Sequence, residues 1–132
     1  MKLGLDTNVI VRYLVRDDPA QFERAGRLIR HEAGRGEPVM VSLLVLLEVE
    51  WVLRSRYELS KAEILGAFGA MVAADDLEFE DEASVEEALY SWKNSTADFA
   101  DCLIGARNRR LECRATATFD AKALRLAGFI SV

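Results

Sequence analysis

The sequence predicts an α/β fold, with a central, mostly parallel sheet between two layers of helices. Short apolar segments of strand length alternate along the chain with longer segments of helical periodicity. Strands that alternate with helices pair in parallel and are covered by helices on both faces. The chain has 132 residues, 51% of them apolar, which suits one domain with a substantial core. We therefore expect a single domain over residues 1–132.

Start signals place the elements of the first half of the chain. Asp18 followed by Pro19 is typical of a helix N-cap and first helical position, and Gly34 and Gly36 end that helix. Ser42 precedes another helix, and Ser60 with Glu63 forms a capping-box pattern. We expect strands at residues 2–5 and 38–41, and helices at residues 7–16, 19–33, 43–54 and 61–74.

In the second half, apolar and acidic residues alternate at 77–80, as in an exposed or edge strand. Helical spacing follows at 84–92, and Thr96 is placed to cap a helix over residues 97–110. The sequence after residue 110 predicts a strand at 115–119, a helical turn or two at 121–126, and a last strand at 129–130.

Five carboxylates interrupt these otherwise apolar segments: Asp6, Glu48, Asp98, Asp101 and Asp120. Asp6 and Asp120 each follow a predicted strand, and ligands of parallel sheets bind outside the carboxyl ends of strands. A buried carboxylate is costly unless something pairs with it, and few basic residues are adjacent. A divalent metal ion is the simplest shared partner.

Glu48 and Glu50 belong to the same predicted helix and are expected to face differently. Glu48 shares a face with Leu44 and Trp51, so we expect it to point inward, with Trp51 in the core. Glu50 has Arg54 four residues on and is expected to be a solvated surface acid.

The other acids each have a purely structural alternative. Asp6 can cap the helix that follows it. Asp98 can interact favourably with the positive end of the helix dipole at the start of its helix, and Asp120 can close a turn at the end of a strand. Asp98 and Asp101 are one helical turn apart, where like charges destabilise a helix unless a cation joins them. The joint placement of the acids favours a metal site.

The net charge of −5 argues against a protein held to nucleic acid by bulk positive charge, but it does not exclude a nuclease whose acids are neutralised by metal. The positive residues are mostly arginine, whose planar fork suits phosphate. Candidates for a phosphate-binding rim, or for a solvated charged face, are Arg12, Arg16, Arg107, Arg109, Arg110 and Arg114.

The remaining composition indicates a cytoplasmic protein. Cys102 and Cys113 lack a metal-ligand spacing, and we expect them to be free core cysteines in a reducing cytosol. With His31 as its one histidine, the chain has little material for a catalytic triad. The N-terminus does not read as a signal peptide, and the apolar stretch 41–53 is too short to span a bilayer.

Four motifs, in order along the chain, resemble those of the PIN-domain family. They are LDTNVI at residues 5–10, SLLVLLE at 42–48, DFADCLI at 98–104 and TFD at 118–120. As a single short domain with nothing appended, the chain most resembles VapC-type toxins, which are the ribonucleases of bacterial and archaeal toxin–antitoxin pairs.

This resemblance implies a metal-dependent endoribonuclease that uses Mg²⁺ or Mn²⁺ and leaves a 5′ phosphate and a 3′ hydroxyl. Asp6, Glu48 and Asp101 match the core acidic ligands, Asp120 the fourth acid, and Asp98 an extra acid of some members. The family's polar positions, which orient the acids or bound water, correspond to Thr7, Asn8, Ser42 and Thr118.

The resemblance also implies an RNA substrate, a homodimer and a small antitoxin that inhibits the enzyme, with no membrane partner. Val11, Leu14, Phe68 and Met71 could form a dimer or antitoxin surface, although a place in the core is the default expectation for apolar residues.

Three other functions compete with the toxin. A binding module would keep the fold and act by holding a protein partner without cleavage. A housekeeping RNA-processing or DNA flap nuclease of the same superfamily would share the acids. A phosphatase of the haloacid-dehalogenase type would need a second aspartate where this chain has Asn8.

Overall fold

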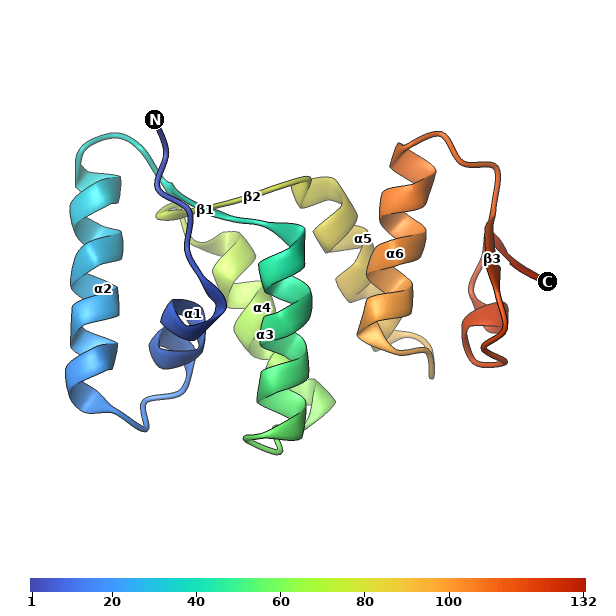
Figure 1. The fold of residues 1–132 in the computed structure, drawn as a ribbon, viewed down its shortest axis with the longest axis horizontal. Coiled ribbons are helices and arrows are strands. Elements are labelled where there is room, and N and C mark those ends of the chain that lie inside the picture. Colours follow the sequence, from blue (N-terminus) through green and yellow to red (C-terminus); the bar gives the residue numbers. More distant parts are fainter. The chain divides into compact units, whose positions relative to one another are not determined.

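A computed structural model describes all residues from 1 to 132, and its elements group into two compact units, Met1–Glu80 and Asp81–Val132 (Figure 1). The first unit contains α1 (Thr7–Leu14), α2 (Pro19–Gly34), β1 (Val39–Val41), α3 (Leu43–Ser55), α4 (Lys61–Ala73) and β2 (Leu77–Phe79). The second contains α5 (Glu82–Lys93), α6 (Phe99–Arg110), β3 (Thr116–Thr118), the 3₁₀ helix η1 (Ala123–Arg125) and β4 (Phe129–Ser131).

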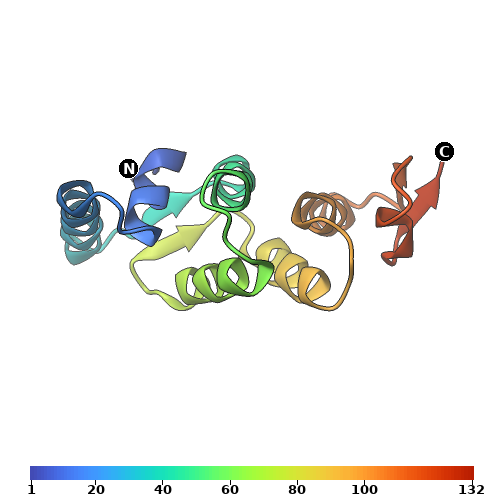
Figure 2. The same cartoon turned by 90° about the horizontal axis from the view of Figure 1, so that it is seen from below.

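In the first unit β1 and β2 pair in parallel, with Val39 opposite Leu77 and Val41 opposite Phe79. All four of these side chains are buried. Figure 2 shows the two strands side by side, and Figure 1 draws α1, α3 and α4 on the same side of them. Helix α4 contacts β2, and α2 contacts β1.

The strand expected at residues 2–5 is reduced to a single parallel bridge between Gly4 and Met40. The backbone N–H of Leu5 donates to Met40 (3.0 Å), and the N–H of Met40 donates to Leu3 (2.8 Å). The segment is therefore extended beside β1, but its pairing is too short to form a regular strand.

The helix starts follow the capping signals of the sequence. Asp18 accepts the N–H of Gln21 at 3.1 Å, and Pro19 is the first residue of α2. Ser60 and Glu63 form the reciprocal capping box, with bonds of 3.1 Å and 2.9 Å. These caps confirm the predicted starts of α2 and α4, because each satisfies N–H groups that the first helical turn leaves unpaired.

The core of the first unit contains the apolar residues that might instead have formed a partner surface. Val11, Phe68 and Met71 are buried, and Leu14 is half-buried. Other buried apolar residues of the first unit are Ile10, Ile29, Leu46, Val49, Leu53 and Ile64. Val11, Phe68 and Met71 are therefore core residues, as expected by default.

In the second unit α5 packs along α6, and β3 pairs in parallel with β4. Gly105 of α6 lies directly under Phe129 of β4, where an added Cβ would come within 2.5 Å of the Phe129 ring. The rings of Trp92 and Phe99 lie 5.1 Å apart and join the ends of the two helices. Parallel strands in both units confirm the α/β fold class.

Helix α6 begins at Phe99 instead of Ala97, so Thr96 is not its cap. The N–H of Ala97 donates to the Ser95 hydroxyl at 3.3 Å, a local turn that competes with an earlier helical start. Asp98 takes the N-cap position in extended conformation, and its side chain makes no capping hydrogen bond.

Asp81 joins the start of α5 to the last turn of α6. Its backbone is left-handed, with φ of 53°, and its carboxylate accepts bonds from the Ser84 N–H and hydroxyl. Arg107 and Arg110 each approach it to 3.0 Å. Burial alone would raise the pKa of Asp81, but the Ser84 hydrogen bonds and the two arginines outweigh it, so the pKa lies below its ordinary value.

The cysteines are both free, but only Cys102 is buried. Cys113 is exposed, so the expectation of two core cysteines is wrong for it, because it lies in the turn after α6. None of the helices has the length and apolar character needed to cross a membrane.

Candidate metal centre

Three of the five predicted acids come together in the second unit. Asp98, Asp101 and Asp120 each offer a carboxylate oxygen, and these oxygens all lie within 4.8 Å of one another. Asp98 is the N-cap of α6, Asp101 lies in its first turn, and Asp120 follows β3. Three carboxylates that converge in this way could hold a divalent cation.

The start of α6 places the first two aspartates. Because Asp98 makes no capping bond, its carboxylate is not committed to the helix backbone. Asp101 is one turn later and lies on the same side of the helix. Asp98 is exposed and Asp101 is half-buried, so the group opens to solvent on one side.

Neighbouring backbone and hydroxyl groups fix Asp120. Its N–H donates to Thr118 Oγ1 at 3.0 Å, and its Oδ1 accepts the N–H of Lys122 at 2.8 Å. The Lys122 ammonium also lies 3.8 Å from Asp98 Oδ1. Sequence reasoning missed Lys122, although a basic residue two positions after a candidate ligand acid is a readable signal.

The electrostatics of the group favour a cation. The pKa of Asp101 is raised, chiefly by burial and then by the negative charges of Asp120 and Asp98, while Lys122 opposes the shift. One exposed lysine therefore does not neutralise the three acids. Carboxylate oxygens are the ligands that Mg²⁺ and Mn²⁺ prefer, so the donor set fits such an ion.

Asp6 and Glu48 belong to the first unit and are not members of this group of three. Asp6 is the exposed N-cap of α1, and its Oδ1 accepts the N–H of Thr7 at 2.7 Å. Oδ2 is not engaged by the cap. Asp6 therefore caps α1, as its structural alternative predicted, and this leaves one carboxylate oxygen for another role.

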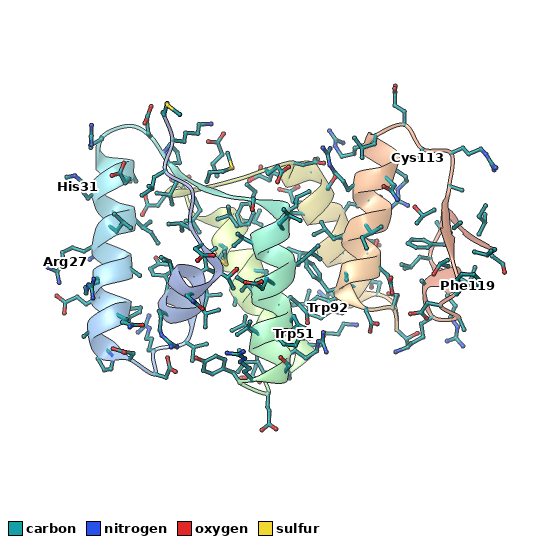
Figure 3. The ribbon with its side chains drawn as sticks, in the orientation of Figure 1. Arg27, His31, Trp51, Trp92, Cys113 and Phe119 are labelled. Carbon is teal, nitrogen blue, oxygen red and sulfur yellow. The ribbon has the colours of Figure 1, made fainter.

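The expected orientations of Glu48 and Glu50 are reversed. Glu48 is exposed on α3, and Trp51, expected in the core, is 51% exposed (Figure 3). Glu50 is buried and accepts from Arg54 Nε at 2.8 Å. The i+4 arginine that suggested a surface position instead satisfies a buried carboxylate.

The predicted supporting residues have distinct local roles. Thr7 is buried and Asn8 is exposed, both in the first turn of α1. Ser42 caps α3, and its hydroxyl accepts the N–H of Val45 at 3.3 Å. Thr118 contacts the backbone of Asp120, the one supporting contact to an acid of the group of three.

Glu80 is a further acid that sequence reasoning missed. It follows β2, and its Oε1 accepts the N–H of Leu43 at 2.9 Å. The Glu80 N–H in turn donates to Val41. Glu80 thus ties the end of β2 to the start of α3, and its position as the last residue of the predicted strand at 77–80 was the available signal.

Most of the candidate rim arginines already have partners within the chain. Arg107 and Arg110 pair with Asp81, and Arg109 pairs with Glu87. These three are therefore structural in this conformation, and a role in phosphate binding would require them to exchange partners.

The other three rim candidates differ from one another. Arg12 donates to the Tyr57 hydroxyl at 2.7 Å and to Gln21. Arg16 lies over the ring of Phe22 at 4.5 Å, in a cation–π contact. Arg114 is exposed. Arg114 is thus the rim candidate most accessible to an external phosphate.

A cavity of about 660 Å³ lies between α1 and α2, and none of the five acids lines it. Its lining includes Asn8, Arg12, Arg24, Arg27 and His31; Arg27 and His31 both project from α2 (Figure 3). The converging carboxylates locate the chemistry better than cavity size does, because a metal centre needs ligands more than volume.

The PIN domain matches residues 4–129, and so covers nearly the whole chain. The chain belongs to the PIN-domain family. PIN domains form a superfamily of nucleases that generally depend on divalent metal, which agrees with the three converging aspartates. The PIN match extends over both units of the structure. A comparison with curated proteins found no match.

Proposed function

We propose that this PIN domain is a metal-dependent endoribonuclease, the toxin of a VapBC-type toxin–antitoxin pair, which hydrolyses RNA phosphodiester bonds with Mg²⁺ or Mn²⁺. The observation that carries the proposal is the convergence of Asp98, Asp101 and Asp120 within 4.8 Å in a PIN domain. Clustered carboxylates with a raised pKa at Asp101 are costly without a cation and useful with one.

In this proposal Asp6, Glu48, Asp101 and Asp120 are the catalytic acids, and Asp98 is an additional metal ligand. Asp101 and Asp120 would hold the cation from two elements, α6 and the turn after β3. Thr118 and the Lys122 backbone keep Asp120 in place, so its carboxylate is oriented before the substrate arrives.

A bound divalent ion supplies the positive charge that activates a water and neutralises the phosphate during in-line displacement. The acids would hold the ion where a phosphodiester group can approach it. Without the ion, their negative charges would repel the RNA backbone. The Lys122 ammonium adds a positive group at the same place.

The proposed partners are an RNA substrate, a second copy of the chain and a small antitoxin, in the cytoplasm. The two free cysteines are consistent with a reducing compartment. The predominance of arginine over lysine suits contacts with RNA phosphate, and the exposed Arg114 is available for one.

The test is cleavage of end-labelled total RNA by the purified protein, with Mg²⁺ or Mn²⁺ and with chelator. We expect metal-dependent cutting that is lost in Asp6→Asn and retained in Asp75→Asn, a control at an exposed acid of the same unit. The toxin role is tested by expression in a bacterial host, where growth arrest should disappear in Asp6→Asn.

Failure to cut any RNA, with no growth arrest and after removal of co-purified partners, would favour the binding-module alternative. Cutting without growth arrest would instead favour the housekeeping nuclease.

A further inference from the structure

The open cavity between α1 and α2 has a positive lining in a protein that is acidic as a whole. Its charged lining residues are Arg12 from α1 and Arg24, Arg27 and His31 from α2, and no aspartate or glutamate lines it. The complete chain has 22 acidic residues against 17 lysines and arginines, so a lining without acids sets this cavity apart. We call it the α1–α2 groove.

Side-chain contacts join the two helices that form the groove. Arg12 Nε donates to Gln21 Oε1 at 2.7 Å, and the rings of Tyr13 and Phe22 stack with their centroids 6.2 Å apart. Arg12 also donates to the Tyr57 hydroxyl at 2.7 Å. Arg12 therefore has a structural role in the wall of the groove, and these contacts hold the groove open without a ligand.

Helix α2 supplies the positive groups that remain available. Arg24, Arg27 and His31 are exposed, and their spacing places them along one face of the helix, from which Arg27 and His31 project in Figure 3. The side chains of Arg24 and His31 have no partner in the chain. Arg27 pairs with Glu23 at 3.0 Å, but the two side chains are 66% and 69% exposed. Such a pair is weak, so Arg27 can exchange it for an external anion.

We propose that the α1–α2 groove binds the phosphate backbone of the RNA substrate through Arg24 and Arg27, at a site that shares no residue with the three aspartates. The planar guanidinium fork matches the oxygens of a phosphate group and forms charge-assisted hydrogen bonds with them. This inference rests on the proposed ribonuclease function and adds to it a second contact with the substrate.

The extent of the positive face suits a strand better than a single small anion. From Arg24 to His31 the face runs about 10 Å along the helix, at 1.5 Å per residue. A nucleic acid strand carries a phosphate about every 3.4 Å along a duplex axis, so two or about three phosphates can lie beside this face. Leu28, which is 39% exposed, lies on the same face and offers an apolar contact to a ribose or a base.

The first test measures binding of a labelled RNA of mixed sequence to the full chain in the Asp101→Asn background, so that the RNA is not cut. The double variant Arg24→Gln/Arg27→Gln should bind about tenfold more weakly, because two charge-assisted contacts at an exposed surface are lost. The slope of log affinity against log salt should fall by about 1.4 to 1.8, the value for two phosphate contacts. An unchanged slope would overturn the groove as a phosphate site.

Arg30→Gln is the matched control. Arg30 is an exposed arginine of α2 that does not line the groove, so this variant loses the same charge from the same helix. It should leave the salt slope unchanged, whereas Arg24→Gln alone should lower it by about 0.7 to 0.9. An equal fall in both variants would show that overall charge acts rather than a defined site, and would overturn the proposal.

Two further variants test the individual contacts. Arg24→Lys keeps the charge but not the fork, so it should weaken binding while the salt slope stays that of the wild type. Glu23→Gln should strengthen binding by about two- to fourfold, because it releases Arg27 from its ion pair. Weaker binding in Glu23→Gln would contradict the assignment of Arg27 to phosphate.

In the cleaving protein, the double variant should raise KM by about tenfold with little change in kcat, because the groove contains none of the proposed catalytic acids. A wild-type protein that cuts no RNA would overturn the ribonuclease, and weaker RNA binding by the double variant would still support the groove. A protein that cuts RNA while the double variant keeps the wild-type KM and salt slope would overturn only the groove.

An acidic protein segment is the alternative occupant, and competition separates it from RNA. Polyglutamate of matched charge should displace RNA from the wild type much less well than unlabelled RNA does, because carboxylates without a sugar–phosphate backbone do not reproduce its spacing. Equal displacement by polyglutamate, lost in the double variant, would assign the groove to an acidic protein partner and overturn the RNA assignment.

Discussion

Asp101 and Asp120 hold carboxylate oxygens within 4.8 Å of each other, from the first turn of α6 and the turn after β3. Burial and then the charge of Asp120 raise the pKa of Asp101. In the absence of a cation, this mutual repulsion lowers the free energy of unfolding. The metal centre should therefore affect the stability of the protein as well as its activity.

The stability cost should depend on pH. Because the folded pKa of Asp101 is raised, its protonation stabilises the metal-free fold below the ordinary pKa of 3.8, and this contribution is lost as pH rises through the folded value. We expect Asp101→Asn to become the more stable protein in chelator as pH rises through that window. Denaturant unfolding of both proteins across pH measures the difference.

A bound metal ion should make the wild-type protein more stable than Asp101→Asn. Mg²⁺ or Mn²⁺ should raise the melting temperature of the wild-type protein in proportion to the logarithm of its concentration above the dissociation constant. The increase should be absent in Asp101→Asn and retained in Glu86→Gln, an exposed acid on α5. An equal increase in all three proteins would mean that the ion binds elsewhere.

Glu48 and Glu50 offer a matched pair on one helix. We expect Glu48→Gln to reduce RNA cleavage by about 100-fold or more with little effect on stability, because Glu48 is exposed and proposed as a ligand. Glu50→Gln should lower the free energy of unfolding by about 1 kcal/mol by weakening the bond to Arg54. Cleavage assays and urea unfolding separate the two, and the opposite pattern would exchange their roles.

Asp81 should stabilise the second unit only above acidic pH. Its pKa is lowered, so the stability it contributes is present above its ordinary pKa and is lost as pH falls through the folded value. Asp81→Asn should cost about 2 kcal/mol at neutral pH, since it removes charge-assisted bonds to two partly exposed arginines. The difference in unfolding free energy from wild type should shrink as pH falls; a constant difference would contradict the ion-pair account.

Two glycines should respond to alanine with opposite signs. Gly105→Ala should destabilise the protein by about 1 to 3 kcal/mol, because the new methyl group would meet Phe129. Gly66→Ala on α4 should stabilise it by up to about 1 kcal/mol, because nothing lies within 4 Å and alanine favours a helix. Thermal unfolding of both variants checks the packing of β4 on α6.

The sequence predicted what depends on local chemistry. Asp18 with Pro19, and Ser60 with Glu63, are complete capping signals within four residues, and both helices begin where those signals indicate. The proximity of the Asp98 and Asp101 carboxylates was likewise predictable, because the two residues are one helical turn apart. The PIN-domain resemblance, which rested on four motifs, is confirmed by the match over residues 4–129.

Predictions that required a choice between faces of an apolar helix were wrong. Residues 43–53 are apolar on nearly all sides, so periodicity could not decide whether Glu48 or Glu50 faces inward. The left-handed conformation of Asp81 was also unreadable, since residues other than glycine seldom adopt it. Its pairing with Arg107 and Arg110 depends on how α5 packs along α6.

The most direct measurement of the central claim is anomalous scattering from Mn²⁺ in crystals of the protein. The account predicts a peak at coordination distance from carboxylate oxygens of Asp98, Asp101 or Asp120, and its loss in crystals of Asp101→Asn. A structure with Mn²⁺ bound only elsewhere, or with no peak at millimolar Mn²⁺, would contradict the assignment of these aspartates to a metal centre.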